Sequence, residues 1–142
     1  MSDDGSRWET WRSVASFLAI LTGVMGSGVL LAPRLFLKFF GATVAPGTVL
    51  FFRAFGASLL YVAVVHHGTK DSRDPKTVRT VLVSNVVEDG LLTLLSADSV
   101  VRGTLGKTGW LLVGAFGSVA ALNAWLATKF ADGDARYVEA TP

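Results

Sequence analysis

Two uncharged stretches decide the fold of this chain: SVASFLAILTGVMGSGVLLA at residues 13–32 and TGWLLVGAFGSVAALNAWLAT at residues 108–128. At 1.5 Å per residue of α-helix, each is long enough to cross the ~30 Å hydrocarbon layer of a bilayer. A helix of a soluble bundle would carry a charged outer face at 3.6-residue spacing, and neither stretch has one. We therefore expect lipid, not water, around both.

Two further apolar stretches lie between them, at residues 48–65 and 77–97. The basic and aromatic segment RLFLKFF, at residues 34–40, is suited to lie flat at a membrane surface. We therefore predict an all-α fold, a four-transmembrane-helix bundle with a short amphipathic interfacial helix between spans 1 and 2. Residues 1–142 would form a single integral membrane domain with polar termini.

Composition supports this assignment and excludes several functions. Of the 142 residues, 51% are hydrophobic and 17% are charged, whereas soluble domains average about 25% charged. The net charge of +2 is small and the basic residues are dispersed, which argues against a nucleic-acid partner. The chain has no cysteine, so thiolate metal sites and thiol catalysis are excluded, and no cofactor motif is present. His66 and His67 are adjacent and point to different helix faces, which favours interfacial histidines over haem ligands.

Lysine and arginine residues near the span ends predict the orientation. One side carries eight: Arg7, Arg12, Lys70, Arg73, Lys76, Arg79, Lys129 and Arg136. The other side carries four: Arg34, Lys38, Arg102 and Lys107. Because the more basic side of a membrane protein faces the cytoplasm, we expect a multi-pass protein with both termini cytoplasmic.

Three charged residues, Arg53, Glu88 and Asp89, lie inside predicted spans. Each costs ~2.5–3.5 kcal/mol at the bilayer centre unless something offsets it. Helix periodicity places Asn85, Glu88 and Asp89 on one arc, which must face protein or a water-filled cavity. We expect the second and third spans to be antiparallel neighbours, with Arg53 at a depth that allows an ion pair with one of the carboxylates.

Two interpretations of these charges stay open. In the first, Arg53 extends towards the membrane surface, Asp89 is its counter-ion, and the cluster is purely structural. In the second, Arg53 and Asn85 bind a ligand, while Glu88 and Asp89 are candidate catalytic groups. Two neighbouring acids in a low-dielectric medium do not ionise equally, and a carboxyl group that keeps its proton suits proton transfer.

Asn123 is the only strongly polar residue inside the fourth span. We expect it to form an interhelical hydrogen bond or to complete the polar cluster as a binding residue. Ala15, Ala19, Gly23 and Ser27 recur every four residues along the first span. Such a small-residue face lets helices approach closely, either within the bundle or between copies in a homo- or hetero-oligomer.

The plan resembles the DoxX-like group of small four-helix integral membrane proteins. The matching features are the first span ending at Pro33, the amphipathic segment Leu35–Gly41, the sequence Arg53-Ala-Phe-Gly-Ala, and the acidic residues Glu88 and Asp89. The resemblance implies the same four-helix fold. Such families include quinone-linked subunits and many uncharacterised proteins.

These observations favour a small polytopic membrane protein that is a non-enzymatic membrane subunit or binds a lipophilic ligand. The alternative is a membrane-embedded enzyme that uses Glu88 and Asp89 with Arg53 for acid/base chemistry on a quinone or isoprenoid type of substrate. A proton-coupled carrier is a third candidate, although four spans are few for a carrier that does not oligomerise.

Overall fold

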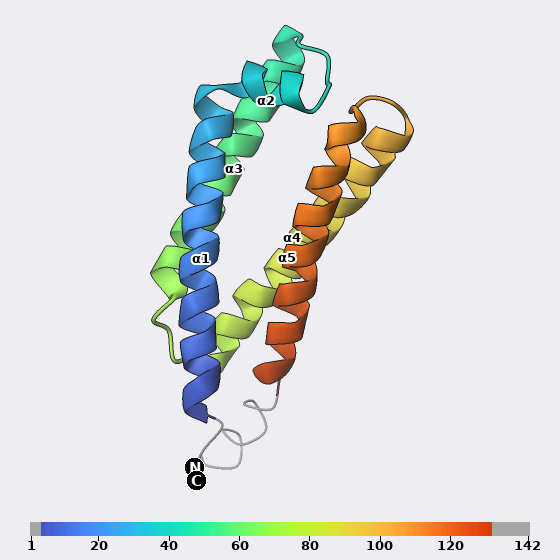
Figure 1. Cartoon of the computed structure of the whole chain (residues 1–142). Coiled ribbons are helices and arrows are strands. Elements are labelled where there is room, and N and C mark those ends of the chain that lie inside the picture. Colours follow the sequence, from blue (N-terminus) through green and yellow to red (C-terminus); the bar gives the residue numbers. More distant parts are fainter. Residues whose placement is uncertain (1–3, 132–142) are drawn as a thin grey trace.

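The computed structural model describes residues 4–131, and within them every regular element is a helix. The elements are α1 (Asp4–Leu31), α2 (Pro33–Phe39), α3 (Pro46–Thr69), α4 (Pro75–Val101), the single 3-10 turn η1 (Lys107–Gly109) and α5 (Trp110–Lys129) (Figure 1). By length and composition, the helices α1, α3, α4 and α5 can each cross a membrane. This confirms the predicted all-α fold with four apolar helices and a short helix after the first.

Prolines begin three of these helices, because Pro33, Pro46 and Pro75 occupy their first turns. Proline suits this position, where its φ is already helical and its missing N–H would have no helical partner. At the start of α4, the Asp74 carboxylate also accepts hydrogen bonds from two backbone amides. Helix α1 begins at Asp4, well before the uncharged stretch, so the polar N-terminal segment is largely helical. Most of the polar C-terminal segment, residues 132–142, lies outside the described residues.

The long helices are arranged as two pairs. Helix α1 packs along α3 and helix α5 packs along α4, whereas α3 and α4 have little contact (Figure 1). The second and third spans, expected to be antiparallel neighbours, therefore meet over a short stretch only, and their main packing partners are α1 and α5. Glycines explain the α1–α3 pairing, because a Cβ on Gly26 would lie 2.8 Å from the carbonyl oxygen of Gly56. Only glycine at both positions allows the two backbones to approach this closely.

The hydrophobic core lies at one end of the bundle, which we call the basal end. Its buried residues come from α1, α4 and the end of α5: Trp11, Ala15, Val78, Leu82, Leu126 and Phe130. The indole Nε1 of Trp11 donates a hydrogen bond to the carbonyl oxygen of Thr69, 3.0 Å away, which connects α1 to the end of α3. The basal end therefore joins all four long helices.

At the opposite end, which we call the α2 end, the two pairs diverge (Figure 1). Hydrogen bonds between loops connect them there. The amide of Gly106 donates to the carbonyl oxygen of Phe40 (2.7 Å), and the hydroxyl of Thr108 donates to that of Phe39 (2.6 Å). Gly41 has a φ of +67° and a Cβ there would lie 3.0 Å from Gly106, so glycine is required on both counts.

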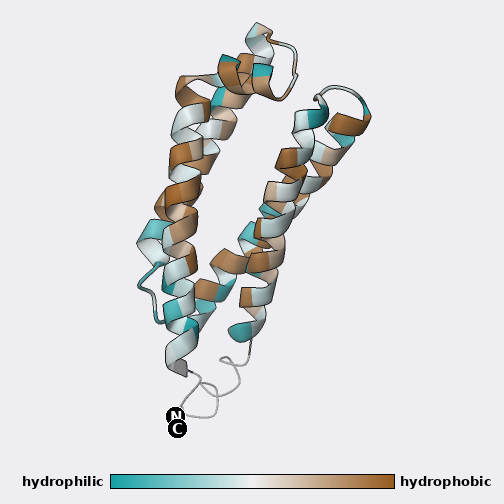
Figure 2. Ribbon diagram, viewed as in Figure 1, coloured by the Kyte–Doolittle hydropathy of each residue, from teal (hydrophilic) through white to brown (hydrophobic). Residues whose placement is uncertain are grey.

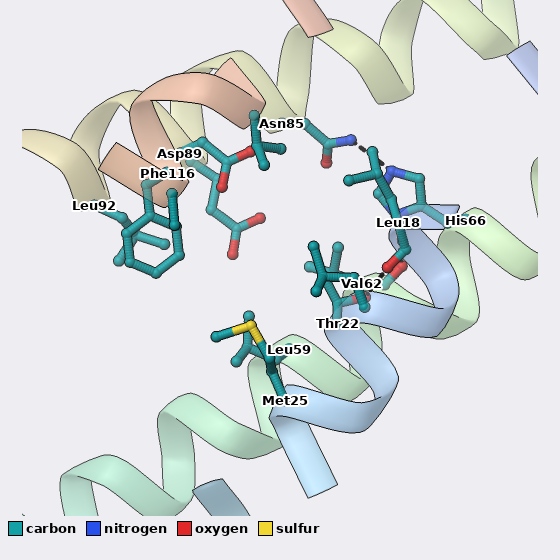
Figure 3. A pocket seen from close by; sticks show the side chains of 14 residues that line it. Leu18, Thr22, Met25, Leu59, Val62, His66, Asn85, Asp89, Leu92 and Phe116 are labelled. Atoms are coloured by element: carbon teal, nitrogen blue, oxygen red, sulfur yellow. Dashed lines mark hydrogen bonds between the residues drawn. The ribbon is translucent and has the colours of Figure 1, made fainter. Parts of the chain in front are cut away.

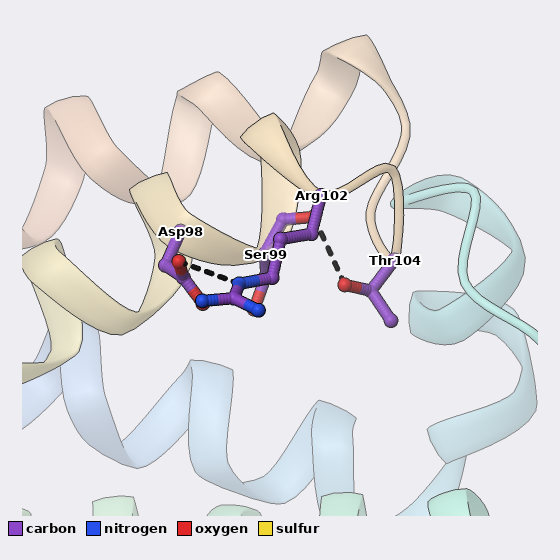
Figure 4. Close-up of polar contacts among 4 residues, drawn as sticks. All are labelled: Asp98, Ser99, Arg102 and Thr104. Atoms are coloured by element: carbon purple, nitrogen blue, oxygen red, sulfur yellow. Dashed lines mark hydrogen bonds and ion pairs between the residues drawn. The ribbon is translucent and has the colours of Figure 1, made fainter.

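The end of α4 is defined by local hydrogen bonds (Figure 4). The hydroxyl of Thr104 donates to the backbone carbonyl oxygen of Ser99 (3.1 Å), and Gly103 adopts a φ of +73° that stops the helix. Arg102 donates from Nε to the carboxylate of Asp98 one turn earlier (2.8 Å). This ion pair is exposed, so it contributes little to stability.

The outer surface of the bundle is apolar over the length of the long helices. Figure 2 shows hydrophobic residues along all four of them, with hydrophilic residues concentrated towards the loops and helix ends. Large hydrophobic side chains are exposed on every long helix, among them Ile20, Leu50, Leu94 and Leu111. Such a surface fits a multi-pass membrane protein, in which lipid covers these side chains.

Candidate functional site

A small cavity of about 60 Å³ lies where all four long helices approach one another (Figure 3). Most of its lining is aliphatic or aromatic, with Leu18 and Met25 from α1, Val62 from α3, and Phe116 from α5. Its polar lining consists of Thr22, His66, Asn85, Glu88 and Asp89. We call this space the inner cavity, and it has room for a few water molecules or a small polar group.

Helix periodicity brings three of the polar residues to the inner cavity. Asn85, Glu88 and Asp89 lie on the same arc of α4, and Ser96 continues that arc two turns later. Asn85 and Ser96 are buried, while Glu88 and Asp89 are half-buried. The polar arc of α4 therefore faces the interior of the bundle, and the structure brings the predicted residues Asn85, Glu88 and Asp89 together at one cavity.

His66 of α3 joins this group through a buried hydrogen bond. Its Nδ1 lies 2.9 Å from the backbone carbonyl oxygen of Val62, and its Nε2 lies 2.9 Å from Nδ2 of Asn85. A carbonyl oxygen can only accept, so in the neutral ring Nδ1 carries the hydrogen and Nε2 accepts from the Asn85 amide. This bond crosses from α3 to α4 and fixes the orientation of both side chains (Figure 3).

His66 is 1% exposed, so it lies inside the bundle and not on its surface. Its ring lies beside that of Trp11, with centroids 6.4 Å apart. The sequence contains a signal for this burial, because Gly56, Leu59 and His66 recur at intervals of three and seven residues and form the buried face of α3. His67, the next residue, is exposed, as its position on another face requires.

Neither carboxylate of the inner cavity has a partner among the described residues. No hydrogen bond or ion pair from a described side chain reaches the carboxylate oxygens of Glu88 or Asp89. The hydrogen bond recorded at Asp89 involves its backbone carbonyl oxygen, which accepts from the hydroxyl of Thr93. Figure 3 shows the Asp89 carboxylate beside the cavity. These two groups are therefore available to a molecule inside it.

Arg53 does not take part in this site. It is exposed on α3, it does not line the inner cavity, and the structure gives it no ion pair with a described residue. The expected pairing of Arg53 with Glu88 or Asp89 is therefore absent from the described residues. The reason lies in the packing, because α3 is held against α1 and is in slight contact with α4.

Asn123 is fully buried in α5, but it also lies outside the inner cavity. Its amide Nδ2 donates to the backbone carbonyl oxygen of Val119 in its own helix (3.0 Å), and its Oδ1 is buried without a partner in the described residues. The interhelical hydrogen bond expected of Asn123 is thus not formed there. Val119, one turn away, does line the cavity.

The small-residue face of α1 lies largely within the bundle. Ala15 is buried in the basal core, and a Cβ on Gly23 would lie 3.7 Å from Ala63 of α3. Ala19 borders a groove between α1 and α3, and Ser27 is half-buried. In the described residues, this face therefore packs against α3 at Gly23 and against the residues of α4 and α5 in the basal core at Ala15.

A second, larger cavity of about 490 Å³ lies between the two helix pairs towards the α2 end. We call it the outer cavity. Its lining is mainly hydrophobic, with Phe51, Phe52 and Phe55 from α3 facing Leu95 and Leu112 of the other pair. A few hydroxyl side chains border it: Thr43, Thr48, Ser96, Ser99 and Thr104. Cavities of this volume and composition are typical of sites for small lipophilic molecules.

The inner and outer cavities share two lining residues, Leu92 and Phe116. The ring of Phe116 packs edge-on against that of Phe55, with centroids 6.2 Å apart. An apolar space therefore adjoins a small polar one, with aromatic and aliphatic side chains at the boundary. A molecule with an apolar body and a compact polar head would fit this arrangement.

The described residues hold no group of three or more histidine, cysteine, aspartate or glutamate side chains that could bind a metal ion. The polar groups of the site can form hydrogen bonds and can accept or release protons. Comparisons of this chain with protein-family models, with curated proteins and with solved structures find no match.

Proposed function

We propose that this chain is a membrane protein that binds a lipophilic molecule between its two helix pairs. The observation that carries this proposal is the outer cavity, about 490 Å³ of mainly hydrophobic space in a cleft between the helix pairs that is partly open to its surroundings. Its size lies within the ~300–1,000 Å³ typical of ligand sites. The adjoining inner cavity supplies the few polar groups that orient a ligand in such sites.

A substitution that fills the cavity tests the proposal. Leu112 lines the outer cavity, whereas its neighbour Leu111 lies on the outer surface and is 61% exposed. Leu112→Trp therefore places an indole in the cavity, and Leu111→Trp places the same group in the surrounding lipid. The pair differs in the face of α5 that carries the indole, so Leu111→Trp is the matched control.

The measurement is the amount of lipophilic molecule that co-purifies with each variant in a mild non-ionic detergent, followed by extraction and mass spectrometry. We expect wild type and Leu111→Trp to retain the same molecule at similar occupancy, and Leu112→Trp to retain much less. Equal retention by all three chains, or retention of nothing beyond bulk lipid, would refute a binding function for the cavity.

The orientation of the protein is part of this proposal. We infer that the basal end faces the cytoplasm, because the N-terminal segment and the α3–α4 loop carry the excess of basic residues. The chain has no native cysteine, so single cysteines report accessibility directly. Arg73→Cys, in the α3–α4 loop, should react with a membrane-impermeant maleimide from the cytoplasmic side. Arg34→Cys, on α2, should react from the opposite side, and the reverse pattern would invert the orientation.

A membrane-embedded enzyme is a second candidate, favoured by the unpartnered carboxylates of Glu88 and Asp89 beside the lipophilic cavity. In this case the carboxyl groups would transfer protons without help from Arg53. If so, wild type and Asp89→Asn should retain chemically different molecules, distinguished by chromatography and mass spectrometry, because the variant would accumulate substrate. Identical molecules in both chains would favour binding without turnover.

A further inference from the structure

The polar groups of the inner cavity can be sorted into those that still have a hydrogen to donate and those that do not. The ring of His66 uses both nitrogens, one as donor to Val62 and one as acceptor from Asn85. Thr22 donates its hydroxyl hydrogen to the backbone carbonyl oxygen of Leu18 (2.7 Å). Neither His66 nor Thr22 therefore offers a free donor to a molecule in the cavity.

The groups that remain are acceptors. Asn85 is 7% exposed, its Nδ2 is bound to His66, and its carbonyl oxygen has no partner among the described residues. Figure 3 shows this oxygen directed towards the cavity, on the same side as the carboxylate of Asp89. Asn85, Glu88 and Asp89 thus present side-chain oxygen atoms to the cavity, and no described residue donates a hydrogen bond to these atoms.

The ionisable groups that line the inner cavity are acidic, apart from the imidazole of His66. Glu88 and Asp89 line it, and none of its described lining residues is a lysine or an arginine. Even a half-buried carboxylate without a counter-ion is unfavourable in a medium of low dielectric constant. With both carboxyl groups ionised, the site lacks a cation and hydrogen-bond donors, and one kind of head group supplies both.

We propose that the inner cavity binds the protonated amine of a lipophilic molecule whose apolar body occupies the outer cavity. This inference rests on the proposed ligand-binding function and names the head group that the site selects. An ammonium group is compact enough for about 60 Å³ and donates N–H bonds to Asn85, Glu88 and Asp89. Its charge stabilises the ionised carboxylates, and such charge-assisted hydrogen bonds are roughly twice as strong as neutral ones.

The acceptor oxygens and acidic side chains of the inner cavity disfavour other head groups. A carboxylate or phosphate would meet two acidic side chains and acceptor oxygens, and would be repelled. A neutral alcohol can donate one hydrogen bond, but it does not neutralise charge. A quinone presents carbonyl acceptors, and it would find a donor here only on a protonated carboxyl group.

The test uses three probes with the same chain: dodecylamine, dodecan-1-ol and dodecanoate. Binding of each to the full-length protein in dodecyl maltoside is measured by native mass spectrometry at neutral pH, where the amine is protonated. We expect dodecylamine to bind at least about tenfold more tightly than dodecan-1-ol, because hydrogen bonds between charged groups are roughly twice as strong as neutral ones. Dodecanoate should bind most weakly.

The double substitution Glu88→Gln with Asp89→Asn removes the charge while preserving the size of both side chains. We expect it to abolish the preference for the amine while binding of dodecan-1-ol persists, which also shows that the variant is folded. Asp98→Asn is the control, because Asp98 is a carboxylate on the same helix that is exposed and outside both cavities. It should keep the preference for the amine.

Equal affinity for amine and alcohol, or an unchanged preference in the double variant, would overturn the assignment of the head group. These failures are distinct from failure of the proposed function. If Leu112→Trp blocks the alcohol but the amine has no advantage, the lipophilic site stands and the amine inference is wrong. If Leu112→Trp leaves all three probes unaffected, the cavity is not the binding site and both proposals fail.

Discussion

Substitution of Gly26 by alanine tests whether the close contact between α1 and α3 holds the fold together. The new Cβ would lie 2.8 Å from the carbonyl oxygen of Gly56, against about 3.4 Å for an ordinary contact, a shortfall of about 0.6 Å. It would also lie 3.0 Å from the Cβ of Leu59 and from the backbone nitrogen of Leu60. Two of these three atoms belong to the α3 backbone, so the helices themselves must separate.

The expected magnitude follows from two opposing effects. Overpacking of a tight contact costs about 1–3 kcal/mol, whereas alanine in place of glycine favours a helix by up to ~1 kcal/mol. We expect Gly26→Ala to lower the free energy of unfolding by about 1–2 kcal/mol. Gly114→Ala is the control, because a Cβ on Gly114 of α5 would have no neighbour within 4 Å. The control should be neutral or slightly stabilising.

Thermal unfolding in detergent, followed by tryptophan fluorescence, measures both variants. A loss of 1 kcal/mol lowers Tm by about 2–4 °C in a chain somewhat longer than this one. Gly26→Ala should therefore melt several degrees below Gly114→Ala. If the two variants melt together, or if Gly26→Ala is the more stable, the glycine contact does not determine the pairing of α1 with α3.

Three further substitutions test other parts of the structure. Asp74→Ala removes the N-terminal cap of α4, and we expect it to lower Tm at neutral pH. Hydrogen bonds from Thr77 lower the pKa of Asp74 below its usual 3.8, so the higher Tm of the wild type should be lost only as the pH falls below that value. A wild-type Tm that stays higher in strong acid would contradict this role of Asp74. Trp11→Phe removes the indole donor to the Thr69 carbonyl oxygen and should cost at least about 1 kcal/mol in thermal unfolding, so an unchanged Tm would argue against that hydrogen bond. Arg53→Ala should leave both Tm and ligand retention unchanged. A loss of retention like that of Leu112→Trp would show that Arg53 contributes to ligand binding, contrary to the structure.

The span-forming helices were predictable because the transfer of charge into lipid is so costly. Residues 13–32 and 108–128 carry no charge, and both lie within helices that can cross a membrane. Hydropathy does not determine which helices become neighbours, because lipid covers every apolar face equally well. The α1–α3 pairing depends on a close contact of Gly26 with Gly56, and a single sequence does not show which glycines meet.

The candidate site was predictable on one helix and not between helices. Helix periodicity alone places Asn85, Glu88 and Asp89 on one face of α4. Their environment depends on tertiary packing, which keeps Arg53 away and brings His66 into a buried hydrogen bond with Asn85. Position along a span indicates depth in the membrane, but two residues at equal depth meet only when their helices are in contact.

Because the hydrophobic core lies at the basal end, a rotation of one helix pair about the core would move the α2 end of that pair the most. Ala15 lies in that core, and Leu31, where α1 ends, is sixteen residues farther along, or ~24 Å at helical rise. A rotation of about 5° about the core would therefore displace the far end of α1 by ~2 Å, about half the width of a methyl group. The hydrogen bonds from Gly106 to Phe40 and from Thr108 to Phe39 oppose such a rotation, because they join the two pairs at their far ends. The core at one end and these hydrogen bonds at the other together set the width of the space between the pairs.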